Sequence, residues 1–333
     1  MKYDVITIGS ATRDVFLRSG GIETIRSPKS ITGKAEIIPL GSKVNIEELV
    51  FAVGGSAANA AVTFARRGMR TAMATRVGKD SNGNDIVAAM RKEKIAIEFI
   101  RRDPKLFSPY SVILLAEKGE RSILAYRGAG GSFSPSDVSF SSLTAKWFYV
   151  THLSDRSAPL FPKLLWHADR IGAQVAANPG KTQLTMPLAK LKPLLNLIDV
   201  FILNREEGAY LTKVPYRDAD RIFKKLDSWV RGFVVMTDGA GGVTVSDGKT
   251  RWHAGVLKER KLLDRTGAGD AFGSAFVSGL IERKNDVAHA IQLGSANATS
   301  VIEAIGAQPG ILRKRDSISK WGKLPIQVKK LAI

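Results

Sequence analysis

A loop of small residues in the last third of the chain leads directly into an apolar, helix-forming stretch. The loop reads Gly267-Ala268-Gly269-Asp270. Backbone N–H groups at a helix start are unpaired and carry partial positive charge, so they bind anions, and glycine lets an anion approach closely. A carboxylate beside such an anion hole can take a proton from a hydroxyl that attacks a phosphoryl group. The four residues are therefore candidate catalytic residues; the alternative is a helix cap with a tight turn.

A second glycine motif lies earlier in the chain. Gly54 and Gly55 precede an alanine-rich, helix-forming stretch that contains Asn59. The glycines let a ligand lie close to backbone amides, and the Asn side chain can both donate to and accept from hydroxyl groups. Taken alone, such a motif is also typical of close helix packing.

The bulk composition is that of a globular protein. The chain has 333 residues, of which 44% are hydrophobic and 24% charged, enough for a large core in one α/β domain or in two smaller ones. It contains no cysteine and only four histidines, without metal-ligand spacing, so disulfides, thiolate metal sites and a histidine metal site are not expected. An apolar run long enough for a transmembrane helix is missing, and the first residues resemble a strand rather than a signal peptide. We expect a cytoplasmic protein.

The charge is unusual. Fifty Lys and Arg against 31 Asp and Glu give a net charge of +19, which is one mark of nucleic-acid binding. The cations are spread along the chain, however, and no aromatic–basic interleaving is present. The sequence therefore favours a generally basic protein without a nucleic-acid partner, whose charge assists recruitment of a polyanion such as a nucleotide.

Short apolar runs alternate with helical stretches along most of the chain, which indicates an α/β fold with a largely parallel sheet. Two stretches, about 15–52 and 98–128, break this rhythm with β-prone pieces and turns, including a hairpin with its turn at Lys118-Gly119. We expect these insertions to form a small β-sheet lid, and residues 320–333 to be loosely attached. The expected strands are 5–9, 71–77, 146–152, 174–177, 200–204 and 233–237, and the expected helices are 56–67, 82–94, 160–171, 206–212, 218–229, 271–282 and 286–305.

The two glycine motifs, in this order, resemble the two signatures of the ribokinase-like sugar kinases, the phosphofructokinase B family. The likeness covers nearly the whole chain. Its further elements are the opening Gly9–Asp14, the segment Arg76–Gly83, the Asn204-Arg205-Glu206-Glu207 motif and the loop Thr237–Gly242. The resemblance implies a single Rossmann-like three-layer α/β/α domain, residues 1–333, with a small β lid.

The resemblance also implies roles for the reactive groups. Asp270 is the base that accepts the proton of the substrate hydroxyl, and the amides of Gly267, Ala268 and Gly269 stabilise charge on the transferred phosphoryl group. The resemblance implies that Asn204 and Glu207 organise Mg²⁺ through water, and that Asp264 belongs to a site for a monovalent cation such as K⁺. Carboxylate and amide oxygens suit Mg²⁺. Arg265 stands where many relatives have Thr or Ser.

The remaining implied residues bind ATP and the acceptor. Thr237, Gly239 and Gly242 lie along the nucleotide phosphates, and Asn297 lies near the base. On the acceptor side, the implied residues are Asp14, Gly54, Gly55 and Asn59, because a carboxylate can accept two hydroxyl hydrogen bonds. Arg127 at the end of the lid hairpin is a candidate for binding a phosphate or carboxylate of the substrate. The segment Thr151-His152-Leu153 lacks a carboxylate that sugar-binding relatives often carry nearby.

The sequence thus predicts a kinase that uses ATP and Mg²⁺ to phosphorylate a primary hydroxyl of a sugar or sugar-like substrate. A nucleoside kinase of the adenosine kinase type is the alternative, with Phe16 either stacking on the base or packing inside the lid. A catalytically inert, basic binding protein is a third hypothesis, which the intact motifs disfavour. The resemblance also suggests a homodimer formed through lid strands.

Overall fold

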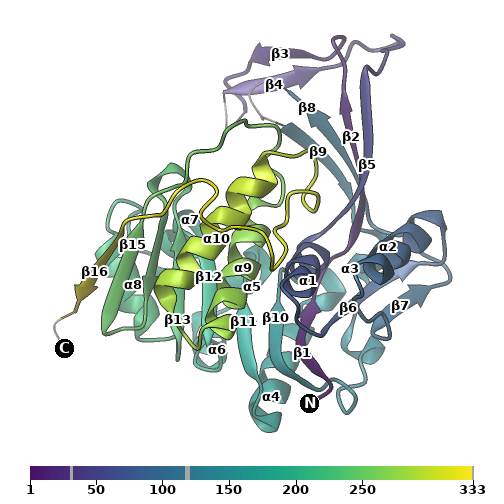
Figure 1. Cartoon of the computed structure of the whole chain (residues 1–333). Helices are drawn as coiled ribbons and strands as arrows, with labels where there is room; N and C mark the ends of the chain where they lie inside the picture. Colours follow the sequence, from purple (N-terminus) through teal and green to yellow (C-terminus); the bar gives the residue numbers. More distant parts are fainter. Residues whose placement is uncertain (31–32, 117–120, 332–333) are drawn as a thin grey trace.

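The computed structural model describes residues 1–30, 33–116 and 121–331. Its centre is a ten-stranded sheet in the order β16-β15-β14-β13-β12-β11-β10-β1-β6-β7, drawn in Figure 1. Neighbouring strands from β13 to β7 pair in parallel. These strands are β1 (Tyr3–Ile8), β6 (Thr71–Gly78), β7 (Ile100–Asp103), β10 (Ala145–Val150), β11 (Gln174–Ala177), β12 (Val200–Asn204) and β13 (Phe233–Thr237). The predicted α/β class is confirmed.

Three antiparallel strands extend the sheet beyond β13. They are β14 (Val243–Ser246), β15 (Thr250–Ala254) and β16 (Ile326–Lys330). The expectation of a loosely attached C-terminal segment was wrong for β16, because Trp252 of β15 pairs with Val328 and the nearby Leu324 and Ile326 pack against the core. Only Ile326 of this strand is partly buried, and Val328 is exposed, so β16 is an exposed edge strand with lysines at its end.

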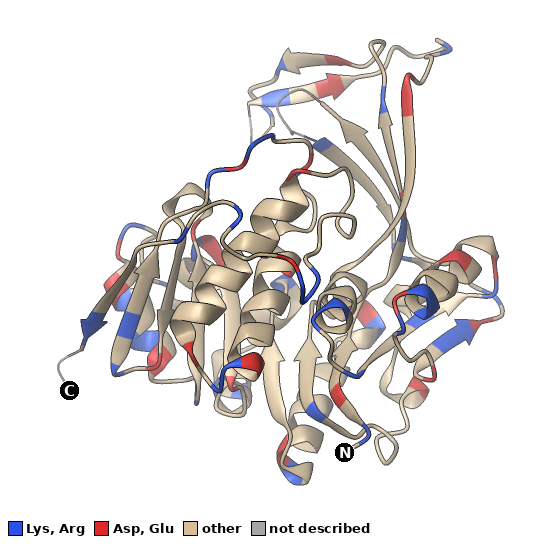
Figure 2. Cartoon of the chain, viewed as in Figure 1, with Lys and Arg blue, Asp and Glu red and all other residues tan. Residues whose placement is uncertain are grey.

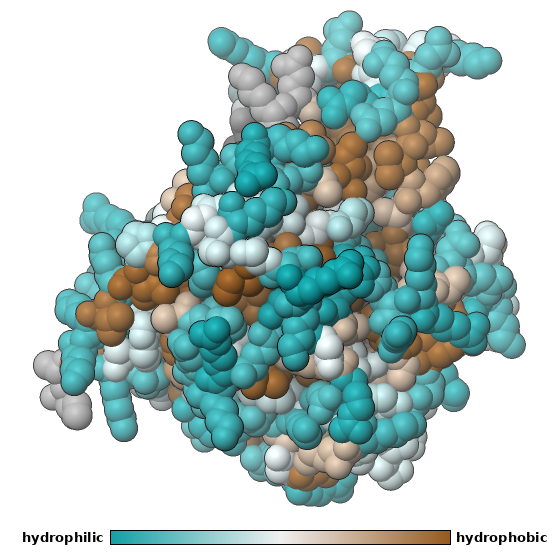
Figure 3. All heavy atoms as spheres, in the orientation of Figure 1, coloured by the Kyte–Doolittle hydropathy of each residue, from teal (hydrophilic) through white to brown (hydrophobic). Residues whose placement is uncertain are grey.

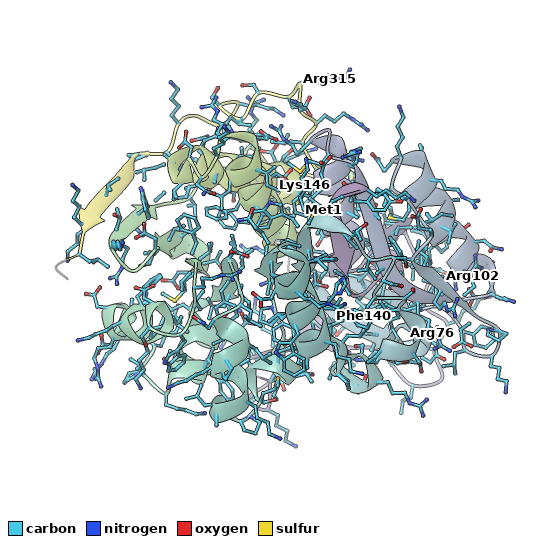
Figure 4. All side chains as sticks on the ribbon, turned by 90° about the horizontal axis from the view of Figure 1, so that it is seen from below. Met1, Arg76, Arg102, Phe140, Lys146 and Arg315 are labelled. Carbon is cyan, nitrogen blue, oxygen red and sulfur yellow. The ribbon has the colours of Figure 1, made fainter. Side chains whose placement is uncertain are left out.

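Helices cover both faces of the sheet, as the two views show (Figures 1 and 4). On one face, Phe64, Phe276 and Ile291 pack with strand residues such as Val5 and Val235. These side chains come from α1 (Ser56–Arg66), α9 (Ala268–Glu282) and α10 (Val287–Ile302), and α2 (Ser81–Lys92) lies beside them. On the other face lie α4 (Leu160–Ile171), α5 (Lys181–Leu184), α6 (Leu188–Leu195), α7 (Arg205–Thr212) and α8 (Ala219–Asp227).

A second sheet stands above the carboxyl end of the first as a lid (Figure 1). Its order is β5-β2-β8-β9, and a separate hairpin joins β3 to β4. The bounds are β2 (Thr12–Arg18), β3 (Glu23–Arg26), β4 (Lys34–Ile37), β5 (Glu48–Gly54), β8 (Tyr110–Leu115) and β9 (Arg121–Tyr126). The second expected insertion, residues 98–128, begins too early. Strand β7 at its start pairs with β6 in the main sheet and is not part of the lid. The predicted turn at Lys118-Gly119 lies outside the described residues.

The inner face of the lid has its own small core. Phe16 is fully buried against Ile113, Leu115 and the partly buried Val50 and Ile305. The outer side carries exposed apolar residues of β5 and β9, such as Leu49, Phe51 and Leu124, where Figure 3 shows apolar atoms along the lid. Within the described part of the chain, no helix is long and apolar enough to cross a membrane.

Candidate active site

The N-terminus of α9 presents the loop that the sequence singled out. Gly267 occupies the cap position in the left-handed conformation, with φ of 79°, and no side chain caps the helix. A Cβ at Gly267 would lie 2.4 Å from Cβ of Ala307, so only glycine fits. A Cβ at Gly269 would meet nothing within 4 Å, which leaves open space in front of the first turn. The helix start can therefore accept an anion at its amides.

Asp270 lies in this first turn and faces α1. Nδ2 of Asn59 donates to Oδ2 of Asp270 at 2.9 Å, and the Ser56 side chain also hydrogen-bonds the carboxylate. Nε2 of Gln308 in turn donates to Oδ1 of Asn59 at 3.3 Å. Burial raises the pKa of Asp270, and the hydrogen bonds from Asn59 and Ser56 oppose this. An ionised carboxylate with a raised pKa is a stronger proton acceptor than one in water.

The Gly54-Gly55 motif brings α1 and the lid together. Gly55 caps α1 with φ of 91°, and a Cβ there would lie 2.7 Å from backbone atoms of Ser10 and Ala11. The amides that open α1 are already paired, because Ser10 accepts from the N–H groups of Ser56 and Ala57. Helix α1 therefore has no free anion site, and its contribution is to position Asn59. In α9, by comparison, the Ala268 amide makes only a long hydrogen bond of 3.4 Å to the Arg265 carbonyl.

Asp14 projects from β2 onto the same region. A Cβ at Gly54 would lie 1.9 Å from Oδ2 of Asp14, so the glycine makes room for the carboxylate. The side chain is only 6% exposed. Burial raises the pKa of Asp14 to about 6, while hydrogen bonds from Ser111 and Thr12 lower it and the nearby Asp264 carboxylate adds to the rise. Such a carboxylate is poised to accept hydrogen bonds from a bound polyol.

Asn204 and Glu207 form a reciprocal cap at the start of α7. Oδ1 of Asn204 accepts from the Glu207 amide at 2.8 Å, and Oε2 of Glu207 accepts from the Asn204 amide at 2.9 Å. Burial raises the pKa of Glu207, the Asn204 bond lowers it, and Glu206 raises it further, so a cation near Glu207 would be favourable. Among the described residues, no group of three or more His, Asp or Glu could hold a metal ion by itself.

The loop Thr237–Gly242 begins beside this cap, because Asn204 at the end of β12 pairs in register with Thr237 at the end of β13. Gly239 and Gly242 follow with φ of 51° and 82°, and a Cβ at Gly242 would lie 2.1 Å from the Ala254 carbonyl oxygen. Asn297 lies on α10 and is buried; it donates to the Ala271 carbonyl and accepts from the Leu312 amide, both at 2.8 Å. Its amide thus joins α10 to α9 and to the segment at Leu312, and contact with a base stays a prediction.

Asp264 is buried under the α9 loop. Its Oδ1 accepts from the amide and hydroxyl of Thr266 at 2.9 and 2.6 Å, and its Oδ2 accepts from the Gly306 amide at 3.1 Å. The carboxylate therefore shapes the loop that carries Gly267. A monovalent cation would have to share it with these three donors, so the fit to K⁺ is poor at this side chain. Arg265 is exposed.

Sequence reasoning missed the residues whose hydrogen bonds position α1, Asp270 and Asn59. Ser10 caps α1, Ser56 hydrogen-bonds Asp270, and Gln308 orients Asn59. Tyr149 of β10 was missed as well. It is buried, and its hydroxyl oxygen lies against Gly273, one turn beyond Asp270, where a Cβ would be only 2.7 Å away. Single serines and glutamines carry no pattern that singles them out, and only the fold brings these residues together.

The carboxyl edge of the parallel sheet thus carries a helix start that no side chain caps, a partly buried carboxylate and a second sheet above them. Phosphoryl transfer needs an anion site beside a proton acceptor, and this arrangement could supply both. The comparison with known families agrees with this chemistry. Residues 23–314 match the model of the pfkB family carbohydrate kinases, and the chain belongs to this family. It is a phosphotransferase with an alcohol group as acceptor.

Individual relatives cover most of the chain. A ribokinase of Haemophilus influenzae is 30% identical over 84% of this chain and 90% of its own length. Among solved structures, the adenosine kinase of Sinorhizobium meliloti has a TM-score of 0.76 at 25% identity, covering 93% of this chain and 96% of that one. The ribokinase of Arabidopsis thaliana, solved with ribose and ATP, has a TM-score of 0.75 at 21% identity, covering 96% and 99%. The protein is thus similar to both sugar kinases and nucleoside kinases.

Proposed function

We propose that this protein transfers the γ-phosphoryl group of ATP to a primary hydroxyl of a sugar or sugar-like substrate. Asp270 takes the proton from the hydroxyl, and the amides of Gly267, Ala268 and Gly269 stabilise the transferred phosphoryl group. The observation that carries the proposal is the uncapped start of α9 next to the Asp270–Asn59 pair, with open space in front of Gly269. Gly54, Gly55 and Asp14 form the acceptor side.

The nucleotide lies, in this proposal, along Thr237, Gly239 and Gly242, with its base near Asn297. Mg²⁺ supplies charge neutralisation for the phosphates, and Glu207 with Asn204 would hold it through water. The raised pKa of the partly buried Glu207 supports a cation in this place. Asp264 supports a K⁺ site less well, because its carboxylate already accepts three hydrogen bonds.

A nucleoside acceptor is the second candidate. It is favoured by the likeness to the adenosine kinase of Sinorhizobium meliloti. Phe16, the aromatic residue that could stack on a base, instead fills the core of the lid. This packing favours a sugar over a nucleoside.

We also propose that the protein works in the cytoplasm without a nucleic-acid or membrane partner, and as a homodimer through lid strands. The exposed Leu49 and Phe51 on the edge strand β5 support such pairing. Light scattering should give twice the mass of one chain, and Phe51→Glu should reduce it to one.

The experiment that tests the proposed function is an ADP-release screen of the purified protein. Neutral pentoses, hexoses, sugar acids and nucleosides are compared as acceptors, with Mg²⁺ or EDTA and with or without K⁺. We expect Mg²⁺-dependent ADP release above the background ATPase for at least one sugar-like acceptor. Activity on nucleosides alone would favour the second candidate, and no acceptor-dependent release would contradict both.

A further inference from the structure

A cavity of about 180 Å³ lies between the lid and the carboxyl ends of β1 and β10. It adjoins the proposed reaction centre. Ser10 lines it and also accepts a hydrogen bond from the Ser56 amide, and the Ser56 side chain reaches Asp270. An acceptor whose hydroxyl lies at Asp270 would therefore place its far end in this cavity.

The side chains that line the cavity include a cation and no anion. Its lining residues are Gly9, Ser10, Thr12, Pro109, Ser111, Ala125, Tyr126, Arg127, Gly130, Gly131, Phe133, His152, Leu153, Ser154 and Ser157. Aspartate, glutamate, asparagine and glutamine are missing from this set. The hydroxyl groups of the wall can donate to and accept from either a neutral polyol or an anion. The feature of the wall that favours an anion is therefore its unopposed positive charge.

Arg127 is the cation of this wall. Its Nη1 donates to Oγ of Ser154 at 2.6 Å, and within the described parts of the chain it forms no ion pair within 4 Å. The carboxylate of Asp155 accepts from Ser154 at 3.3 Å but does not line the cavity. The guanidinium therefore keeps donors for a ligand, and its planar fork suits two oxygens of a carboxylate or phosphate.

The backbone that carries Arg127 is held tightly. The next residue, Gly128, has φ of 45°, and a Cβ there would lie 2.2 Å from the Phe107 carbonyl oxygen, which also accepts from the Ala129 amide at 2.8 Å. A Cβ at Gly130 would lie 2.8 Å from the Pro109 ring. This tight turn at the end of β9 fixes the backbone position from which the Arg127 side chain reaches the cavity.

His152 lies across the cavity from the lid and is also fixed. A Cβ at Gly180 would lie 2.4 Å from Cδ2 of the imidazole, so the ring rests on a glycine. Burial lowers the pKa of His152, the positive charge of Arg127 lowers it further, and the negative charge of Asp155 partly opposes this. The histidine is therefore neutral at pH 7, and Arg127 supplies the charge of the wall.

We propose that the acceptor carries an anionic group, a carboxylate or a phosphate ester, at the end opposite the phosphorylated hydroxyl, and that Arg127 binds this group. The substrate class is that of sugar acids or sugar phosphates with a free primary hydroxyl. This inference rests on the proposed function, since Asp270 fixes which end reacts. Asp14 and Ser111 bind hydroxyl groups between the two ends.

The test compares neutral sugars with related acceptors that carry an anionic group at the first carbon. Ribose is compared with ribose 1-phosphate, which keeps the ring, and with the open-chain ribonate, and glucose is compared with gluconate. The variants are Arg127→Gln and Arg127→Lys. Arg156→Gln is the matched control, because Arg156 is exposed in the same loop region as Ser154 but does not line the cavity. Acceptor-dependent ADP release gives kcat/KM, and the ligand-induced rise in Tm without ATP gives binding.

We expect the wild type to prefer the anionic acceptor by at least about 10-fold, as is typical of a charged hydrogen bond. Arg127→Gln should abolish this preference, and Arg127→Lys should retain part of it. Arg156→Gln should retain all of it and leave activity on neutral acceptors unchanged. If the site is built for a carboxylate, ribonate and gluconate should be the better acceptors. If it is built for a phosphate ester, ribose 1-phosphate should be the better acceptor.

A preference for neutral sugars or nucleosides that Arg127→Gln does not change would overturn the proposal and leave the kinase function standing. If no acceptor is phosphorylated, the proposed function fails. The Tm measurement without ATP then still tests whether Arg127 binds an anion. A rise in Tm with ribonate, gluconate or ribose 1-phosphate that Arg127→Gln abolishes supports the anion site, and no rise contradicts it.

Discussion

The buried carboxylate of Asp14 affects the stability of the folded protein in a pH-dependent way. Its carboxylate is buried against Gly54, and burial raises its pKa to about 6 from an ordinary value of 3.8. Because the folded pKa is the higher one, the folded state holds its proton more tightly, and stability from this group is present below pH 4 and lost as the pH rises through 6. At neutral pH the ionised Asp14 therefore destabilises the empty protein.

We predict that Asp14→Asn stabilises the protein at pH 7.5 by about 2–3 kcal/mol, which corresponds to the pKa rise of roughly two units. The gain should vanish at pH 4, where the wild-type carboxyl is protonated. Urea unfolding at the two pH values measures it. The same substitution should raise the acceptor KM and leave the ATP KM nearly unchanged. Equal stability at pH 7.5 would show that the carboxylate is well solvated.

Two glycines of the α9 loop should respond differently to the same change. Gly267→Ala meets Ala307 and an unfavourable φ, so we expect a loss of about 1–3 kcal/mol in unfolding free energy and of activity. Gly269→Ala enters open space inside a helix, so stability should stay or rise by about 0.5–1 kcal/mol. Its methyl group should raise the ATP KM. Thermal unfolding and steady-state kinetics of both variants check this, and equal behaviour would contradict it.

At the scale of elements, a buried ion pair ties together the two helices that carry Asn59 and Asp270. Arg67 ends α1 and Glu282 ends α9, and two hydrogen bonds of 2.7 Å join them. Both side chains are largely buried. Burial alone raises the pKa of Glu282, but Arg67 lowers it below its usual value.

We predict that Arg67→Met lowers the unfolding free energy by about 3 kcal/mol, because it leaves the largely buried Glu282 carboxylate with only His289, 3.6 Å away, as a partner. Arg70→Met is the control: its pair with Asp4 is exposed and should be worth less than about 1 kcal/mol. Chemical denaturation of both variants decides the matter. Similar losses in the two variants would mean that the Arg67 pair is as weak as a surface pair.

How well the sequence predicted these elements depended on their periodicity. Expected strands at 174–177, 200–204 and 233–237 and the helix at 160–171 agree with the structure to the residue. The sequence prediction left out β14 to β16. They are only four or five residues long, and β15 and β16 are mixed with charged residues, so their apolar positions were too few to be recognised. In the site, the glycine motifs predicted where the chain packs too closely for a side chain. The contacts of Ser56 with Asp270 and of Gln308 with Asn59 could not be predicted, because they join segments that are distant in the sequence.

At the scale of the whole molecule, the positive charge has no single centre. Figure 2 shows Lys and Arg on the lid, the helices and the edge strands. In Figure 4, Arg315 lies on the side of α10, far from Arg76 and Arg102. Many of the arginines are paired; Arg76, for example, contacts Asp103 and Asp137. A dispersed field of this kind attracts polyanions but does not select a sequence.

We predict that duplex DNA binds weakly and loses most of its affinity between about 50 and 200 mM salt, because only released counterions drive the binding. Fluorescence anisotropy with two unrelated duplexes measures this. Sub-micromolar binding of one duplex over the other at physiological salt would contradict the account of the charge.

The central claim is that Asp270 accepts the proton of the attacking hydroxyl, and Asp270→Asn tests it most directly. The substitution keeps the shape of the side chain and removes the proton acceptor, so kcat on the best acceptor should fall by about 10²–10⁴-fold. Both KM values and the Tm should change little, since the anion-binding amides belong to the backbone of the loop. A variant that stays folded and keeps more than about one tenth of the wild-type kcat would contradict the account and leave Asp270 as a helix-capping residue.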